Sequence, residues 1–261
     1  EVFSVTIFNK LLFVNQELML RITSDEDRVI ADEDIQWFSR AEVLDKKENF
    51  NFYITSDFAT STHRKADYTV LGVWAVDHEQ NRYLVDGYLG RFLMSDTFDK
   101  IFELVRKYQP MSAGIEVTGQ QGGFISLLES EMLRRNTYFS IAKGKGTNKQ
   151  GIAVRTNKMD RFRLTEPFFK QKKIFLPEEL KESMLIQEIL EELSTVTIDG
   201  IKSVHDDALD MISQFDQMYI VYPAKNAYNP RNSSQVMSRY SPYFNDTSTL
   251  EQEHNSHVYL A

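Results

Sequence analysis

The sequence predicts an α/β fold with a mixed central β-sheet flanked by helices. Two observations indicate this class. Three strand-like stretches follow one another closely between residues 51 and 91, and beyond them short apolar strands alternate with stretches of helical periodicity. The 261 residues, 42% of them hydrophobic and 26% charged, are enough for one large globular domain or two small ones.

The first block contains three expected strands. NFYITSDFA (51–59) alternates between apolar and polar residues. YTVLGVWAV (68–76) is almost continuously apolar, which is typical of a buried central strand. RYLVDGYLGR (82–91) is the third strand, and the short link DHEQN predicts an antiparallel hairpin between the second and third strands.

Strands and helices then alternate. A helix is expected over residues 95–110, with Ser95 as its cap and Pro110 as its stop. The short strand SAGIEV (112–117) leads into the glycine-rich turn TGQQGG, the helix FISLLESEMLRRN and the strand TYFSIAK (137–143). This order and spacing predict parallel strands joined by helical crossovers.

The following stretch is rich in lysine and arginine. FFKQKKIFLP (168–177) is expected to be a strand or hairpin that exposes lysines, so we predict a basic β-hairpin added to the sheet. A helix with Pro177 in its first turn comes next. The last predicted helix contains HDDALDM (205–211), in which the apolar residues lie on one face and the aspartates lie off it.

Composition suggests three segments. Residues 1–50 carry many acids and few apolar anchors and are expected to be a linker, residues 51–222 the main domain, and residues 223–261 a flexible, polar tail. The chain starts with Glu1 rather than methionine, so we expect a fragment of a longer protein. No apolar run approaches the ~20 residues that span a bilayer, and no signal peptide is recognisable.

Cysteine content and net charge restrict the chemistry. The chain has no cysteine, which excludes disulfides and thiolate zinc sites. Its net charge of −8 argues against nucleic-acid binding, because such proteins usually present a basic face.

Acidic residues occur where strands end and where the last helix begins. Asp57 lies late in the first strand, Glu116 lies late in SAGIEV, and Asp206 and Asp207 open the last helix. Functional side chains of α/β sheets gather at such places. Carboxylates from separate elements suit Mg²⁺ or Mn²⁺, and a pair of such ions can promote phosphodiester hydrolysis. The pattern therefore predicts a carboxylate metal site.

Each acid also has an interpretation without a function. Asp57 can simply end a strand, and aspartates are favoured caps in the first turn of a helix, where the helix dipole stabilises negative charge. Glu116 is harder to explain in this way, since a glutamate beside an apolar strand is costly unless it is paired. Three further residues are expected to support the site, although a turn or a cap also accounts for the first two: Asp67, His205 and Asp210.

The order of these motifs resembles the nuclease domain of the large terminase subunit of tailed bacteriophages. The matching stretches are DFATSTHRKADYTVLGVW, GIEVTGQQGGF, TNKQGIAVR, the basic hairpin and HDDALDM, and they cover about residues 50–222. The resemblance implies an RNase H-like fold, related to retroviral integrases and Holliday-junction resolvases. It also implies an endonuclease that cuts concatemeric viral double-stranded DNA during genome packaging.

The resemblance assigns the acids. It implies that Asp57 is the metal ligand of the first strand and that Glu116 is the second acidic position. The third acid is Asp206 or Asp207, and resolvase helices favour Asp207. Two Mg²⁺ or Mn²⁺ ions would be held there, one activating a water and the other neutralising the departing 3′ oxygen. A junction resolvase and a non-enzymatic portal-docking module are the alternative functions.

The resemblance also implies partners. Its ATPase motor requires G-x-x-x-x-G-K-[ST], and the nearest stretch here, GKGTNKQG, lacks the required Gly-Lys-Ser/Thr, so the motor is expected on another part of the protein or on another chain. The resemblance likewise implies the portal protein and the small terminase subunit as partners. It implies the cytoplasm of the infected bacterial host as the location. Basic residues between the second and third acids are expected to contact the DNA backbone, with an ordinary solvated surface as the alternative. The candidates are Lys143, Lys145, Lys149, Arg155 and Lys172.

Overall fold

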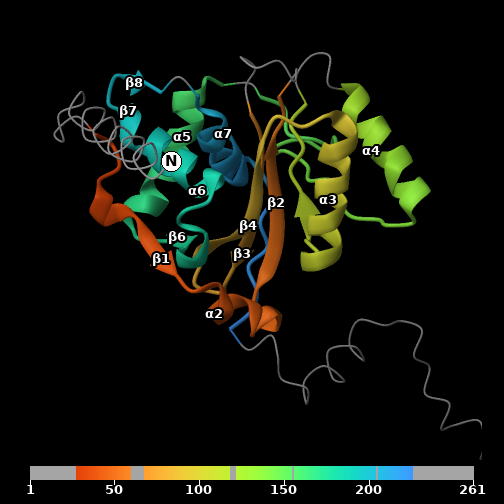
Figure 1. Cartoon of the computed structure of the whole chain (residues 1–261), viewed down its shortest axis with the longest axis horizontal. Helices are drawn as coiled ribbons and strands as arrows, with labels where there is room; N and C mark the ends of the chain where they lie inside the picture. The colour runs from red at the N-terminus through yellow and green to blue at the C-terminus, as the bar shows by residue number, and fades with distance from the viewer. Residues whose placement is uncertain (1–27, 60–67, 118–121, 155, 204, 226–261) are drawn as a thin grey trace, which may run out of the picture. The chain divides into compact units, whose positions relative to one another are not determined.

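A computed structural model describes residues 28–59, 68–117, 122–154, 156–203 and 205–225 (Figure 1). Six strands form one mixed sheet in the order β1-β6-β4-β3-β2-β5. Their bounds are β1 Gln36–Phe38, β2 Asn51–Asp57, β3 Thr69–Val76, β4 Arg82–Gly90, β5 Ser112–Ala113 and β6 Ile174–Pro177. Neighbours β2, β3 and β4 are antiparallel, β5 runs parallel to β2, and β6 runs parallel to β4 and β1.

Helices cover both faces of this sheet (Figure 1). The α-helices are α2 Arg40–Leu44, α3 Met94–Tyr108, α4 Gly122–Arg135, α5 Lys158–Lys170, α6 Met184–Thr195 and α7 Asp207–Gln214. Four 3-10 turns, η2 Asp32–Asp34, η3 Lys47–Asn49, η5 Glu178–Leu180 and η6 Phe215–Gln217, and a ribbon of β7 Val196–Thr197 and β8 Gly200–Ile201 complete the described elements. None of the helices in the described ranges is both long enough and apolar enough to cross a membrane.

The middle strand β3 divides the core in two. All eight of its residues are buried, because β2 and β4 flank it and helices cover both faces. Alternate residues such as Trp74 and Val76 pack with α5, α6 and α7, whereas Leu71 and Val73 pack with α3 and α4. The predicted central strand and its hairpin to β4 are therefore both present.

Several predicted elements between residues 95 and 143 differ from the structure. Helix α3 begins at Met94, so that Ser95 lies inside it and does not cap it. The helix ends at Tyr108, and the next residue, Gln109, has a left-handed backbone directly before Pro110. SAGIEV forms only the two-residue strand β5, and residues 137–143 form single bridges, such as Ala113 with Ile141, rather than a strand.

The expected basic β-hairpin over residues 168–177 is not formed. Residues 168–170 are the last turn of α5, and β6 pairs in parallel with β4 and β1. Phe162 and Phe169 explain the difference, since they are seven residues apart, fully buried and on one face of α5. Similarly, Pro177 ends β6, and α6 begins only at Met184 behind the cap Ser183.

The described part of the expected linker packs against the sheet. Ile30, Phe38 and Val43 are buried, and β1 forms one edge of the sheet beside β6. The Ser39 hydroxyl and the Arg40 backbone N–H both donate hydrogen bonds to the Glu179 carboxylate. Residues 28–50 therefore belong to the folded domain. The sequence suggested a linker because a strand as short as β1 leaves little periodicity in a sequence. Residues 1–27 and the tail from residue 226 onward lie outside the described residues.

Gly87→Ala is expected to destabilise the protein by about 2 kcal/mol. A Cβ at residue 87 would lie 2.3 Å from the Leu71 carbonyl oxygen and 2.6 Å from Leu185 Cδ2. Gly123→Ala is the matched control, because a Cβ there meets nothing within 4 Å, and it should stabilise α4 by up to about 1 kcal/mol. Urea unfolding of both variants measures the difference, and equal stabilities would contradict this packing.

Candidate metal centre

Helix α7 lies close against β2 and β3, and two glycines allow this approach. A Cβ at Gly72 in β3 would lie 2.4 Å from Met211 Sδ, and a Cβ at Gly114, just after β5, would lie 2.4 Å from Gln214 Oε1. Any larger residue at either position would displace an α7 side chain. The helix is therefore held near the carboxyl ends of β2 and β5.

Hydrogen bonds set the position of α7 along the sheet. The Ser56 N–H donates to Gln214 Oε1 at 2.9 Å, and Gln214 Nε2 donates to the Ser56 carbonyl at 2.8 Å. The Ser56 hydroxyl donates to the Gly114 carbonyl at 2.6 Å. All three residues are buried. Asp57 directly follows Ser56 in the chain, and Glu116 comes two residues after Gly114. This network fixes three backbones relative to one another.

Four of the predicted acids come together on these elements. Asp57 is the last residue of β2, Glu116 pairs with Ile152 beyond β5, and Asp207 and Asp210 lie in the first turn of α7. Burial and the negative charges of Asp210, Glu116 and Asp207 raise the pKa of Asp57 well above its usual value. Burial and the charge of Asp210 likewise raise the pKa of Glu116.

Two cations on α5 face this cluster. Arg161 Nη2 donates to Asp210 Oδ1, and Lys158 Nζ lies 3.0 Å from Asp210 Oδ2. Lys158 Nζ also donates to Asp206 Oδ1. Burial alone would lower the pKa of Lys158, but its bonds to Asp206 and Asp210 raise it above its usual value.

Neither Lys158 nor Arg161 was among the candidate site residues of the sequence. Their spacing of three places both on one face of a helix, but that relation is visible only once residues 158–170 are recognised as helical. The buried Phe162 and Phe169 on the same helix are the signal that identifies it.

The aspartates do not cap α7 through their side chains. Asp206 occupies the N-cap position without accepting a capping hydrogen bond. Asp207 Oδ2 instead accepts a 2.7 Å hydrogen bond from the Tyr68 N–H. The Glu192 carboxylate, on α6, accepts from the N–H groups of Ala208 at 3.1 Å and Leu209 at 2.7 Å. A residue on another helix therefore satisfies the donors that helix capping would have assigned to the aspartates.

Glu192 was also missed, although the sequence carries a signal for it. It lies on the apolar face of α6 with Ile189 and Leu193 and is fully buried. Burial raises the pKa of Glu192 to about 8, although its two backbone hydrogen bonds act in the opposite direction. A charged residue on an otherwise apolar helix face indicates a buried partner.

The remaining candidates are more scattered. The His205 ring packs on Tyr68 with 5.0 Å between centroids, and its buried Nδ1 makes no hydrogen bond within the described residues. Lys143, Lys145 and Lys149 are exposed on the 143–150 loop, where the Lys145 N–H donates to the Gln217 carbonyl beyond the C-terminal end of α7. Lys172 follows α5 at the end opposite Lys158, and two predicted residues, Asp67 and Arg155, lie outside the described residues.

The carboxylate cluster suits a hard divalent cation by its chemistry. Asp57 and Glu116 form no ion pair within the described part of the chain, and burial first and neighbouring acids second raise their pKa values. Carboxylate oxygens are the ligands that Mg²⁺ and Mn²⁺ prefer. Among the described residues, however, no group of three acids or histidines is arranged to hold one ion together. Asp206 and Asp210 are bonded to Lys158 instead.

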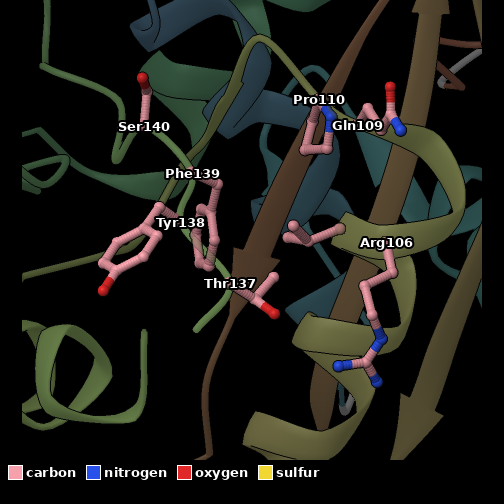
Figure 2. Close-up of a pocket in the computed structure, with 8 residues that line it drawn as sticks. Arg106, Gln109, Pro110, Thr137, Tyr138, Phe139 and Ser140 are labelled. Carbon is pink, nitrogen blue, oxygen red and sulfur yellow. The ribbon is translucent and has the colours of Figure 1, made fainter. Parts of the chain in front are cut away.

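A separate pocket of about 480 Å³ contains no acid (Figure 2). Arg106 and Gln109, at the end of α3, and the segment Thr137–Ser140, which follows α4, line it. None of its lining residues belongs to the carboxylate cluster.

Glu192→Gln is expected to change the pH dependence of stability. Because the folded-state pKa of about 8 exceeds the usual 4.5, the unfolded chain loses its proton first, and the free energy of unfolding falls as pH rises from about 4.5 to about 8. Each pKa unit corresponds to about 1.4 kcal/mol. The variant should match the wild type near pH 4.5 and exceed its stability by a few kcal/mol near pH 8.

Urea unfolding across this pH range measures the effect, with Glu191→Gln as the matched control, because Glu191 is exposed on the same helix. A Glu192→Gln variant less stable than the wild type at pH 8 would show that the carboxylate is favoured in the folded state.

No protein-family model and no curated protein sequence matches this chain. Solved structures do match it. The human cytomegalovirus terminase nuclease domain, Mn-soaked and inhibitor-bound, has a TM-score of 0.51 at 14% identity over 74% of this chain and 100% of that one. The same domain, Mn-soaked only, has a TM-score of 0.50 at 14% identity over 71% of this chain and 94% of that one.

The large terminase nuclease of thermophilic phage G20c with bound magnesium has a TM-score of 0.48 at 13% identity, over 73% of this chain and 96% of that one. At such identities the cytomegalovirus likeness shows the fold alone. The chain therefore has the mixed α/β, RNase H-like fold of terminase nuclease domains, which confirms the predicted fold class.

Proposed function

We propose that this chain is a divalent-metal-dependent endonuclease that cuts viral double-stranded DNA during genome packaging. The observation that carries the proposal is the gathering of Asp57, Glu116 and Asp207 from three separate elements of a terminase-nuclease-like fold. Burial and the neighbouring acids raise the pKa of Asp57, which supports a site where added positive charge is favourable. The ATPase motor, the portal, the small terminase subunit and the cytoplasm of the bacterial host belong to the same proposal.

Asp57, Glu116 and Asp207 would hold the metal ions. We favour Asp207 over Asp206, because Asp207 is buried and acts on Asp57, whereas Asp206 is bonded to Lys158. Asp210 supports the site, since Arg161 and Lys158 engage both of its oxygens. When bound, two Mg²⁺ or Mn²⁺ ions supply an activated water and neutralise charge on the leaving oxygen.

The chain's own residues provide the positioning. The Tyr68 N–H fixes the Asp207 carboxylate, and the Gln214–Ser56 pair keeps α7 in register with the end of β2. The backbones that carry these carboxylates are thus fixed before substrate arrives, which reduces the ordering that catalysis requires. The exposed lysines of the 143–150 loop would contact phosphates rather than base edges, so cutting would have little sequence specificity.

Cleavage of supercoiled plasmid by the full chain, with Mn²⁺, Mg²⁺ or EDTA, tests the function. We expect nicked and linear products only with metal. Asp57→Asn and Asp207→Asn should each reduce cutting by at least on the order of a hundredfold, because each removes an anionic ligand. Asp199→Asn is the matched control, since Asp199 is exposed in the β7–β8 turn, and it should cut like the wild type.

Folded protein that leaves the plasmid intact under all conditions would overturn the proposal. A preference for four-way junctions over linear duplex would instead identify a resolvase.

Asp57→Asn should also raise the melting temperature measured without metal. The substitution removes a charge that the partial burial of Asp57 disfavours and that Asp210, Glu116 and Asp207 repel. We expect an increase of a few degrees by thermal unfolding in EDTA. A lower melting temperature would mean that the Asp57 charge stabilises the fold, against the combined effect of burial and repulsion.

A further inference from the structure

Two cations on α5 face the carboxylate cluster. Within the described ranges, they act on the carboxylates of Asp57, Glu116, Asp206 and Asp210. Both cations bind the same side of the cluster, at Asp206 and Asp210, and Asp57 and Glu116 receive only their longer-range field. The positive charge is therefore concentrated beside the carboxylates that would hold a divalent ion, and it opposes the charge of that ion.

The two cations differ in mobility. The Arg161 side chain is only 5% exposed, and its planar guanidinium is held against the equally buried Asp210. The Lys158 side chain is 43% exposed and ends in a flexible stem whose ammonium reaches both Asp206 and Asp210. Lys158 can therefore exchange its partners by rotating its side chain, whereas Arg161 cannot.

In the part of the chain that the structure describes, the ammonium of Lys158 is held by its ion pairs with Asp206 and Asp210. It is the first residue of α5, where the positive end of the helix dipole disfavours a cation. The Asn157 side chain accepts a hydrogen bond from the Asp160 N–H and fixes the start of the helix, so the backbone of Lys158 stays in place while its stem moves. Cancelling the charge of Asp206 and Asp210 removes the attraction that keeps the ammonium there.

We propose that Lys158 is an exchangeable counter-cation: it binds Asp206 and Asp210 while the neighbouring carboxylates hold no divalent ion, and it binds a phosphate of the DNA once an ion on those carboxylates supplies the positive charge. This inference rests on the proposed nuclease function and adds a substrate-binding residue to it. It also accounts for the arrangement of the acids, two of which are occupied by an internal ammonium.

Calcium titration by calorimetry tests the competition, because Ca²⁺ takes the same oxygen ligands as Mg²⁺. Lys158→Gln removes the competitor and should tighten Ca²⁺ binding several-fold. Lys158→Arg keeps the charge but grips a carboxylate in a bidentate manner, so it should weaken Ca²⁺ binding. Lys172→Gln, at the other end of α5, is the matched control and should bind Ca²⁺ like the wild type.

Unchanged or weaker Ca²⁺ binding by Lys158→Gln would overturn the competition, provided that the variant melts like the wild type. If Lys158→Gln fails to fold, tighter Ca²⁺ binding by Lys158→Arg overturns it.

Anisotropy of a short labelled duplex, in Ca²⁺ and in EDTA, tests the transfer to phosphate. With Ca²⁺, Lys158→Gln should weaken DNA binding about three- to tenfold and reduce the slope of log Kobs against log salt by about one. In EDTA the loss should be less than about twofold, because the ammonium is held by Asp206 and Asp210. Lys172→Gln should cause the same change in both conditions.

If Lys158→Gln loses the same duplex affinity in Ca²⁺ and in EDTA, Lys158 contacts the DNA permanently. If it loses affinity in neither condition, Lys158 does not contact the DNA. Either outcome overturns the transfer. A gel run on the same samples confirms that the duplex is intact. A wild-type chain that binds neither Ca²⁺ nor duplex would overturn the nuclease function itself. If the wild type cuts plasmid with metal but Lys158→Gln binds Ca²⁺ and duplex like the wild type, this inference alone is overturned.

Discussion

The close approach of α7 to the sheet is the constraint on which the rest of the site depends. Gly72 and Gly114 leave the space for it, and the paired hydrogen bonds between Gln214 and Ser56 set the register. Asp57 and Glu116 extend from the same backbones, within two residues of these contacts. A shift of the helix by one residue would rotate Asp207 and Asp210 away from the ends of β2 and β5.

This packing concentrates charges that would otherwise avoid one another. Burial raises the pKa of Asp57, Glu116 and Glu192. The charged form of each carboxylate is therefore less favourable in the folded protein than it is in water. Arg161 and the α7 backbone donors offset part of this cost. The same repulsion that destabilises the folded cluster favours the binding of a cation to it. A cation that binds only the folded cluster also stabilises the fold.

Features that depend only on neighbouring residues in the sequence were predicted correctly. The apolar runs of β3 and β4 and the one-sided apolar face of α7 are visible in the sequence, and so are acids at the ends of elements. Lys158 and Glu192 were not predicted to be at the site, because their roles depend on how α5 and α6 pack around α7. The lysines of residues 170–173 concealed the helical spacing of Phe162 and Phe169 and suggested a hairpin.

The pairing of β1 with β6 has a consequence for how the protein folds. Ser39, just after β1, bonds to Glu179, which is 140 residues away, and Ser56 bonds to Gln214 across 158 residues. Contacts of such long range form slowly, because a large loop must close before they contribute. During synthesis, the apolar face of β3 stays uncovered until α5, α6 and α7 have been made, so the nascent chain is exposed to aggregation over most of its length.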